Sequence, residues 1–465
     1  MGDQQIISIR NFMAIKSADL VLGRTLLLIG EQASGKSTVA KLLYFFKRVR
    51  HIMRNLIYDH AEYFTNGHRP SGAMLRQDFE NKVRNRFQVF FGSRNLRSDT
   101  DINYCYGPER SIRFRSGSEE ELQLELSDLL ADGLFGSNLE RIISELGNTR
   151  QEIQERRYNQ PRGSLHALST EVDALVESGF GPRQNSLYIP ALRGIEISLP
   201  EQARLRVFGL LSENIRELET GRLPPSSGVA DWYLIRDYVD VATGLRDWYR
   251  EHSFTDLVEA RDRRSLGEQR NMVLANQLVE RILRGRYEHE PDGEKIYFSG
   301  NDAVELSSAS SGQQNSVRIL QDIFLRLTEQ DSAFRVIEEP EAHLYPMAQK
   351  HLLELIALMV NHTDSQVVIT THSPYVLSVF NNLLYATRVA EINPSAHDEI
   401  AETIPEACWL NPDHFYAYAL KDGMCQSIID HETGLIDQNF LDEISEELGD
   451  EFNILYSLHA ESMRA

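Results

Sequence analysis

Residues 26–46, which read LLLIGEQASGKSTVAKLLYFF, constrain the fold more than any other part of the chain. Residues 30–37 fit the pattern G-x-x-x-x-G-K-[ST] without a mismatch. An apolar run at 25–29 precedes the motif, and a helically spaced apolar set follows it: Val39, Leu42, Leu43 and Phe46. This context predicts a strand, a phosphate-binding loop and a helix. A glycine-rich turn without a ligand is the alternative, and the lysine, the serine and both flanks disfavour it.

The loop predicts which residues contact a nucleotide. In such a loop, backbone N–H groups surround the phosphates at a helix N-terminus that favours anions. Lys36 is expected to reach the β- and γ-phosphates, and the hydroxyl of Ser37 is expected to bind Mg²⁺. ATP and Mg²⁺ are therefore the predicted cofactors. The expected nucleotide-binding residues are Gly30, Glu31, Gln32, Ala33, Ser34, Gly35, Lys36, Ser37 and Thr38.

Composition narrows the class of protein. The chain has 465 residues, of which 42% are hydrophobic and 25% charged, as in ordinary soluble globular proteins. No apolar run approaches the roughly 18 to 20 residues that a membrane span needs, so no membrane partner is expected. The three cysteines lie far apart without a C-x-x-C pair, which argues against a disulfide framework or a structural zinc site. We expect a cytoplasmic protein.

The net charge of −21 is unevenly distributed. Residues 1–115 hold 19 Lys and Arg against 10 Asp and Glu, whereas residues 386–465 hold 3 against 17. A basic segment of this kind favours a nucleic-acid or acidic partner, or is simply a solvated surface. The pattern leaves both interpretations open.

The order of strand and helix patterns predicts an α/β fold. Short strand patterns precede the P-loop, and three more follow within 102–126. Apolar residues at helical spacing over 137–176, interrupted by a turn at 159–164, predict a helical hairpin. In the last third, buried strand patterns at 334–339 and 366–373 alternate with helices, which is typical of a parallel sheet. The final 93 residues have an acidic, helical pattern.

Three further elements follow the P-loop in a fixed order. Ser310, Ser311, Gly312 and Gln313 stand directly before an amphipathic helical pattern. Residues 334–346, FRVIEEPEAHLYP, form a buried strand pattern that ends in two carboxylates. Residues 367–377, VVITTHSPYVL, form a second buried strand that delivers a histidine. Each element alone has an ordinary structural explanation, such as a helix cap, but their order together is specific.

This constellation resembles the ATP-binding-cassette (ABC) ATPases, in particular the soluble branch that contains DNA-repair and chromosome-structure ATPases. The SSGQ segment is similar to the signature of that family. The IEEPEAHLYP, TTHSP and YIPALR segments are similar to the SMC-like predicted AAA ATPases related to the overcoming-lysogenization-defect proteins. The expected fold is an ABC-type P-loop head, with a parallel sheet core, an antiparallel β subdomain and helical insertions including a short hairpin.

The resemblance implies a role for each residue. Glu338 would hold Mg²⁺ together with Ser37, and Glu339 would act as general base. His372 would donate to the γ-phosphate, where charge accumulates during phosphoryl transfer. The signature residues Ser310, Ser311, Gly312 and Gln313 would act in trans on the nucleotide of a second protomer. A nucleotide-sandwich dimer is therefore expected. Gln77, Gln88 and Gln184 are all possible sensors of Mg²⁺.

Four units are predicted along the chain. Residues 1–135 would form an N-terminal ATPase lobe with the basic region, and 136–285 a helical insertion around the strand at 186–194. Residues 286–390 would form a C-terminal ATPase lobe, and 391–465 an acidic extension. Gly312 lies 276 positions after Lys36. This separation is longer than in the nucleotide-binding subunit of a transporter, so a transporter function is disfavoured.

The resemblance also suggests a biological role. Stand-alone ATPases of this shape resemble the ATPase subunits of bacterial anti-phage systems of the AriA and PtuA types. The expectation is a sensor and assembly platform for a separate effector nuclease, with DNA or a phage protein as the trigger. No Asp-x-Asp pair for a nuclease site follows His372. The alternatives are a DNA-binding repair-type ATPase and a nucleotide-bound scaffold with little hydrolysis.

Overall fold

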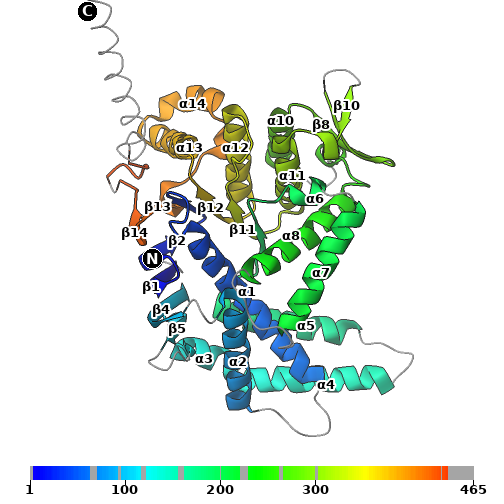
Figure 1. Ribbon diagram of the computed structural model, residues 1–465, viewed down its shortest axis with the longest axis vertical. Coiled ribbons are helices and arrows are strands. Elements are labelled where there is room, and N and C mark those ends of the chain that lie inside the picture. The colour runs from blue at the N-terminus through cyan, green and yellow to red at the C-terminus, as the bar shows by residue number, and fades with distance from the viewer. Residues whose placement is uncertain are drawn as a thin grey trace, which may run out of the picture.

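The computed structural model describes most of the chain, namely residues 4–62, 71–92, 96–116, 122–155, 162–198, 201–219, 229–260, 265–298, 302–430 and 432–437. The dominant element is a mixed sheet of eleven strands in the order β6-β5-β4-β1-β2-β14-β13-β3-β12-β11-β7. Figure 1 shows helices on both sides of this sheet. Its strands are β1 (Gln5–Phe12), β2 (Ile15–Leu22), β3 (Thr25–Ile29), β4 (Leu96–Gly107), β5 (Arg110–Ser116), β6 (Leu122–Leu126), β7 (Asn185–Ile189), β11 (Ala333–Glu338), β12 (Gln366–Thr371), β13 (Phe415–Lys421) and β14 (Met424–Ser427).

Half of the sheet is parallel and half is antiparallel. Strands β13, β3, β12, β11 and β7 pair in parallel, whereas β2, β1, β4, β5 and β6 pair antiparallel. The predicted α/β fold with a parallel core and an antiparallel part is confirmed. The two halves form one continuous sheet, because β14 pairs with both β13 and β2.

The C-terminal segment differs from its predicted helical pattern. Residues 415–427 form β13 and β14, and β13 pairs along the whole length of the P-loop strand β3. Four residues of β13 are buried: Phe415 and Ala417 face one hydrophobic core, and Tyr418 and Leu420 face the other. The sequence pattern did not predict these strands, because acidic residues flank a short segment of aromatic and small residues. That segment is a strand inside the sheet.

The described helices are α1 (Lys36–Glu62), α2 (Gly72–Phe91), α3 (Asp128–Phe135), α4 (Ser137–Glu155), α5 (Arg162–Phe180), α6 (Ile195–Ser198), α7 (Glu201–Glu219), α8 (Val229–Trp248), α9 (Phe254–Glu259), α10 (Leu266–Leu283), α11 (Ser311–Glu329), α12 (Pro346–His362), α13 (Pro374–Ile392) and α14 (His397–Thr403). Among the residues with defined positions, none of these helices is long and apolar enough to cross a membrane. A separate antiparallel sheet contains β8 (Arg286–Glu290), β9 (Gly293–Tyr297) and β10 (Ala303–Glu305).

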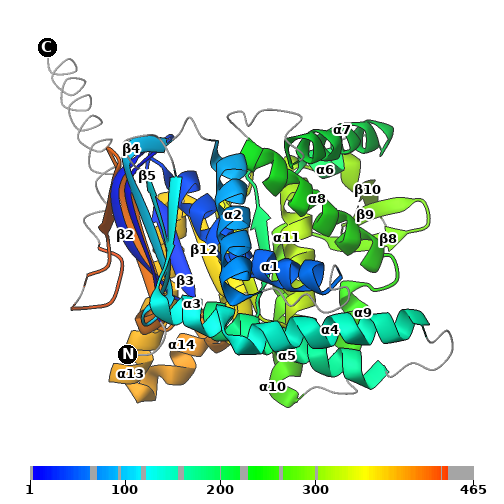
Figure 2. The same ribbon diagram turned by 90° about the horizontal axis from the view of Figure 1, so that it is seen from below.

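The predicted helical hairpin is present as α4 and α5, which lie side by side in both views (Figures 1 and 2). Both helices pack against α1, and their apolar residues are buried there: Leu139, Ile142, Ile143, Leu146, Leu168, Val172 and Leu175. Of the predicted turn at 159–164, residues 159–161 fall outside the described residues, and residues 162–164 belong to α5. The division into four units remains a prediction.

Two hydrophobic cores cover the two faces of the sheet. Along β3, Leu26 and Leu28 belong to the core on the α1 side, while Leu27 and Ile29 belong to the core formed by α10 to α13. Alternate side chains of a strand point to opposite faces, so an unbroken apolar run is what a strand covered on both faces requires. This requirement explains why the strand before the P-loop has no polar interruption.

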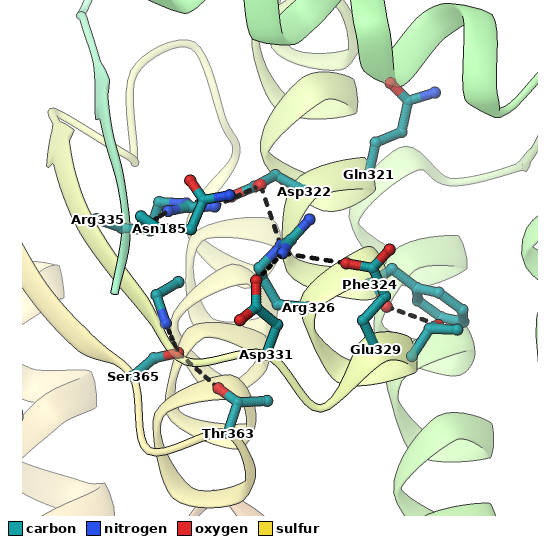
Figure 3. Close-up of polar contacts among 12 residues, drawn as sticks. Asn185, Gln321, Asp322, Phe324, Arg326, Glu329, Asp331, Arg335, Thr363 and Ser365 are labelled. Atoms are coloured by element: carbon teal, nitrogen blue, oxygen red, sulfur yellow. Dashed lines mark hydrogen bonds and ion pairs between the residues drawn. The ribbon is translucent and has the colours of Figure 1, made fainter. Parts of the chain in front are cut away.

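A buried ion pair joins the parallel sheet to α11. The guanidinium of Arg335 in β11 makes two hydrogen bonds to the carboxylate of Asp322 in α11, at 2.5 and 2.8 Å, and a third to the backbone oxygen of Asn185. Both side chains are 2% exposed. Figure 3 shows this cluster, in which Arg326 of α11 also pairs with Asp331. The bidentate geometry fixes α11 relative to β11 and the start of β7.

Replacing Arg335 by methionine should destabilise the protein strongly. Asp322 would lose both hydrogen bonds from Arg335 and would keep only the more distant Arg326, whose Nε lies 3.7 Å from its carboxylate. Breaking a buried pair costs about 3–5 kcal/mol, and Arg326 places the expected loss near the lower end. The matched control is Arg24→Met, whose exposed pair with Asp364 is worth about 0–1 kcal/mol. Urea unfolding followed by far-UV circular dichroism measures both changes. Equal losses for the two variants would contradict the structural role of the Asp322–Arg335 pair.

Candidate active site

The register of the parallel strands brings the predicted site residues to one edge of the sheet. Ile29 of β3 pairs with Thr371 of β12, and Thr370 pairs with Glu338 of β11. The carboxyl ends of parallel strands meet at the same edge, which is where ligands bind in open α/β sheets. The P-loop, Glu339 and His372 therefore leave adjacent strands at the same level.

Close packing fixes the conformation of the P-loop. A Cβ atom on Gly30 would lie 2.3 Å from the backbone oxygen of Leu420 in β13. Gly35 has a φ of 106°, and a Cβ atom there would lie 2.3 Å from Cδ1 of Ile15. Glycine is required at both positions. The motif glycines thus fit a loop that is packed between β2 and β13.

Lys36 lies at the start of α1 and is buried, at 7% exposure. Its Nζ donates hydrogen bonds to the backbone oxygens of Gly30 (2.6 Å) and Glu31 (2.9 Å), so the side chain folds across the loop. Burial lowers the pKa of Lys36, while the nearby carboxylates of Glu339, Glu341 and Glu338 act in the opposite direction. The structure thereby brings the P-loop lysine and the predicted carboxylates into electrostatic contact.

Glu338, the last residue of β11, is oriented by β7 and by the segment that follows it. The hydroxyl of Tyr188 donates to one carboxylate oxygen at 2.6 Å, and the backbone N–H of Ala191 donates to the other at 3.3 Å. Tyr188 is buried, so its hydroxyl has a fixed position. A carboxylate held in this way at a strand end suits the binding of Mg²⁺ through water.

The side chains of Glu339 and His372 are in close contact. Oε2 of Glu339 lies 2.6 Å from Nδ1 of His372, although the angle does not satisfy a hydrogen bond. Glu339 has a φ of 45°, a conformation that a non-glycine residue adopts at a cost, and its backbone N–H donates to the oxygen of Thr370. The side chain of His372 is 62% exposed, whereas that of Glu339 is 19% exposed. The strained turn holds Glu339 at the sheet edge.

Glu341 joins this site, which the sequence did not predict. Its side chain is buried, and one oxygen accepts a hydrogen bond from the Thr371 hydroxyl. Burial, and next to it the charge of Glu339, raises the pKa of Glu341 to about 7. Its second oxygen has no hydrogen-bond partner. In the described part of the chain, Glu339, Glu341 and His372 make the one group with the geometry to hold a metal ion. The sequence feature that could have indicated Glu341 is the EEPE run at 338–341, where a third carboxylate lies close to the other two in sequence.

Arg193 connects the carboxylate turn to the predicted signature helix. Its guanidinium is 1% exposed and donates to the backbone oxygens of Glu338 (2.8 Å), Glu339 (3.0 Å) and Pro340 (3.2 Å). Its Nε donates to the backbone oxygen of Asn315 in α11. Arg193 is therefore a positioning residue. The YIPALR segment indicated a motif in the sequence without indicating this role.

The predicted signature residues begin α11. The side chains of Ser310 and Gln313 form a reciprocal capping box. Gly312 packs closely on the turn after β11, since a Cβ atom there would lie 2.6 Å from the backbone oxygen of His343. Ser310 and Ser311 are exposed. Within the described residues, no hydrogen bond joins the 310–313 segment to the P-loop of the same chain.

The three glutamines proposed as Mg²⁺ sensors lie elsewhere. Gln184 precedes β7 and bonds to Lys47 and Ser332, at the amino ends of the parallel strands and so opposite the P-loop edge. Gln77 and Gln88 lie within α2. Among the residues that the structure describes, no hydrogen bond joins any of the three to Glu338 or Ser37.

The arrangement fits a nucleotide triphosphate with Mg²⁺. The buried Oγ of Ser34 lacks a hydrogen-bond partner, although it lies inside the loop next to Gly30. A phosphate oxygen would satisfy such a donor, and the start of α1 provides N–H groups. Ser37 is exposed at that helix start. Ser37 and Glu338 are the residues that would hold Mg²⁺.

A comparison with protein families gives one match. Residues 255–377 match the family described as AAA ATPase domain. The matched segment contains the predicted signature, both carboxylates of the β11 turn and His372, and it begins after the P-loop helix. This part of the chain is therefore similar to an AAA ATPase domain, and the match does not extend to the P-loop. No curated protein matches the chain.

Several solved structures are similar to the chain at low sequence identity. The SMC head bound to the C-terminal winged-helix domain of ScpA is 11% identical, with a TM-score of 0.39, covering 92% of this chain and 96% of that one. The SMC head domain from Thermotoga maritima is 12% identical, with a TM-score of 0.34, covering 91% and 98%. The recombination mediator protein RecF with ATPrS is 9% identical, with a TM-score of 0.32, covering 92% and 99%.

Glu341→Gln should change how stability depends on pH. The folded protein raises the pKa of Glu341, so the stability that this carboxyl contributes is complete below about pH 4.5 and is lost as the pH rises through about 7. The free energy of unfolding of the variant should equal that of wild type near pH 4.5 and should exceed it by about 1–3 kcal/mol at pH 8. Urea unfolding in EDTA without nucleotide measures this gap.

The control for that experiment is Glu402→Gln, an exposed glutamate whose neutralisation removes no buried charge. A gap of the same size at pH 4.5 and pH 8 would mean that Glu341 is not the titrating group. An unstable variant at all pH values would instead indicate that the carboxylate is required for packing.

Proposed function

We propose that the protein binds and hydrolyses ATP with Mg²⁺, as an ATPase of the ABC and SMC-like type. The observation that carries this proposal is the grouping of Lys36, Glu338, Glu339 and His372 at one sheet edge. If Lys36 and Glu339 served only to stabilise the fold, neither the glycine-dependent P-loop nor the strained backbone at Glu339 would be required. The family match over residues 255–377 supports the same function.

In this proposal each side chain has one task. Glu339 accepts a proton from the attacking water, and the contact with His372 keeps both groups at the reacting edge. Lys36 turns from the carbonyl oxygens of its own loop to the β- and γ-phosphates. Mg²⁺, when bound, neutralises the charge that develops on the phosphate oxygens. Tyr188 and Arg193 hold the carboxylate turn in place.

The signature residues would complete the site of a second copy. Ser310 and Ser311 are exposed at the start of α11, where a hydroxyl and backbone N–H groups are available to an anion. Their lack of hydrogen bonds to the P-loop of the same chain supports action in trans. A homodimer with two nucleotides between the protomers is the expected arrangement.

The proposed biological role is that of a cytoplasmic sensor and assembly platform for a separate effector nuclease in anti-phage defence. This role rests on the resemblance of the motifs to stand-alone ATPases of such systems. Within the described residues, the single group that could hold a metal lies at the nucleotide edge. Nuclease chemistry is accordingly assigned to another chain, and DNA or a phage protein is the proposed trigger.

The basic N-terminal region gives limited support to the DNA-repair alternative. Several of its side chains pair with acidic residues of the same chain, for example Lys41 with Asp231, Arg54 with Asp173 and Lys82 with Asp59. Such pairs neutralise charge that DNA phosphates would otherwise attract. Acceleration of turnover by duplex DNA, with a steep loss at high salt, would favour the alternative.

ATP turnover by the purified protein tests the enzyme assignment. Lys36→Ala should abolish nucleotide binding and turnover, whereas Glu339→Gln should retain binding and lose turnover by about 10²–10⁴-fold, the usual contribution of a general base. Phosphate release and equilibrium binding of ATP measure the two properties. Tight binding without turnover in wild type would overturn the enzyme assignment and favour the scaffold.

Mixing two inactive variants tests the arrangement in trans. Ser311→Arg should block the signature surface, and Lys36→Ala removes the P-loop lysine. In a two-fold dimer that exchanges subunits freely, the mixture should recover about a quarter of wild-type turnover, because half of the dimers are mixed and each has one intact site. Ser212→Arg, an exposed serine in α7, is the control for an added arginine. No recovery on mixing would argue against a shared site.

A further inference from the structure

Three side chains at the sheet edge direct their ligand atoms toward one another. Glu339 and Glu341 belong to the turn after β11, and His372 directly follows β12. One ligand atom from each residue, two carboxylate oxygens and an imidazole nitrogen, lies within 4.8 Å of the other two. Metal–ligand bonds are about 2.0–2.2 Å long, so atoms this close together can bind the same ion.

Two carboxylate oxygens of this group are buried without a hydrogen-bond donor. Glu341 is 7% exposed, and the Thr371 hydroxyl donates to Oε1, whereas Oε2 accepts no hydrogen bond from the described residues. Oε2 of Glu339 is likewise buried without a donor. A buried polar atom without a partner costs about 1–3 kcal/mol, and more when it is charged. A cation bound between the two carboxylates would remove this cost.

The cations beside the group make their hydrogen bonds elsewhere. Nζ of Lys36 donates to carbonyl oxygens of its own loop. The guanidinium of Arg193 donates to carbonyl oxygens of the turn and of α11. In the described ranges, neither side chain donates a hydrogen bond to the carboxylate of Glu339 or Glu341. The carboxylates are thus available to a bound ion.

Thr371 joins the two halves of the group. Its hydroxyl donates to Glu341 and accepts a hydrogen bond from the backbone N–H of Ser373 at 2.9 Å. The carboxylate is therefore held against the segment that carries His372. Outer partners of this kind orient the ligands of metal sites. The side chain of His372 is 62% exposed, which gives an ion access from solvent.

The ligand set favours zinc over magnesium. Mg²⁺ prefers six oxygen ligands and keeps several waters, whereas an imidazole nitrogen suits Zn²⁺. Three protein ligands with a fourth position open to water are a common zinc arrangement. Two ligands on a tetrahedral zinc ion lie about 3.4 Å apart. Nδ1 of His372 lies 2.6 Å from Oε2 of Glu339, so the exposed imidazole moves slightly outward when the ion binds.

We propose that Glu339, Glu341 and His372 bind one zinc ion, and that the bound zinc stops ATP hydrolysis. The ion occupies the Glu339 carboxylate that accepts the proton from water, and the imidazole that faces the γ-phosphate. This zinc site is separate from the proposed Mg²⁺ ligands Ser37 and Glu338. The inhibition rests on the proposed ATPase function, whereas the binding of zinc does not.

The binding test titrates Zn²⁺ into the full chain at pH 8 without nucleotide, in competition with a chromophoric zinc indicator. We expect one saturable site in wild type. Glu341→Gln and His372→Ala should each weaken it at least about tenfold, because even a residue that only orients a metal ligand contributes about 10–100-fold. Two controls should leave the affinity unchanged: His166→Ala removes an exposed histidine of α5, and Glu402→Gln an exposed glutamate of α14.

The outcomes distinguish this site from its alternatives. The absence of a saturable site would overturn the proposal and would favour a proton shared between Glu339 and Glu341. Equal affinity in all five proteins would mean that zinc binds elsewhere on the chain. Millimolar Mg²⁺ should not displace the zinc, and displacement would assign the group to the Mg²⁺ of the ATP site. Urea unfolding identifies a variant that has lost its fold, and the exposed His372 still provides the test if Glu341→Gln does not fold.

The turnover test separates this proposal from the ATPase proposal. With Mg²⁺ in excess over ATP, saturating zinc should lower the turnover of wild type and of His166→Ala by about 10²-fold or more, as loss of a general base does. A zinc-selective chelator should restore turnover. Half-inhibition should occur at the zinc concentration that half-saturates the site, and a different concentration would overturn the inhibitory role. If wild type has no turnover, the ATPase proposal fails, and the zinc titration still decides whether the site exists.

Discussion

The parallel pairing of β3, β12 and β11 is the constraint on which the rest of the structure depends. Its register places Ile29, Thr371 and Glu338 at the same sheet edge, although these residues are up to 342 positions apart in sequence. Both faces of these strands are covered by helices, and a slip in register would move apolar side chains away from their cores and separate the catalytic loops. The apolar continuity of β3 and β12 therefore determines the geometry of the proposed reaction.

The turn after β11 has three consecutive backbone carbonyls that accept hydrogen bonds from a side chain outside the turn. Arg193 supplies donors to three consecutive carbonyls and to Asn315, so one buried guanidinium joins β7, the carboxylate turn and α11. The Asp322–Arg335 pair also joins α11 to β11, at a second buried position further along α11. Two buried arginines thus position α11, and with it the exposed serines proposed to act on a second copy. A change at that interface would reach the turn through these contacts.

Much of the fold was predictable because its signals are local. The P-loop, the apolar strands at 25–29, 334–339 and 366–373, and the hairpin helices have periodic patterns that a short window of sequence contains. The last strands were not predictable in this way. β13 is a short segment within an acidic region. Its place beside β3 depends on pairing with the β3 backbone and on Gly30, whose lack of a Cβ leaves room for the Leu420 carbonyl. The local sequence around 415–421 contains no pattern that predicts its pairing with β3.

The sequence alone determined the chemistry that is available: a phosphate-binding loop, two carboxylates at a strand end, a histidine after the next strand, and a serine-capped helix. Those identities follow from residue type and local spacing. Only the tertiary structure decided which further groups join them, because Tyr188, Arg193, Glu341 and Leu420 reach the site through strand pairing and burial. The raised pKa of Glu341 likewise exists only in the folded chain, since packing removes that side chain from water.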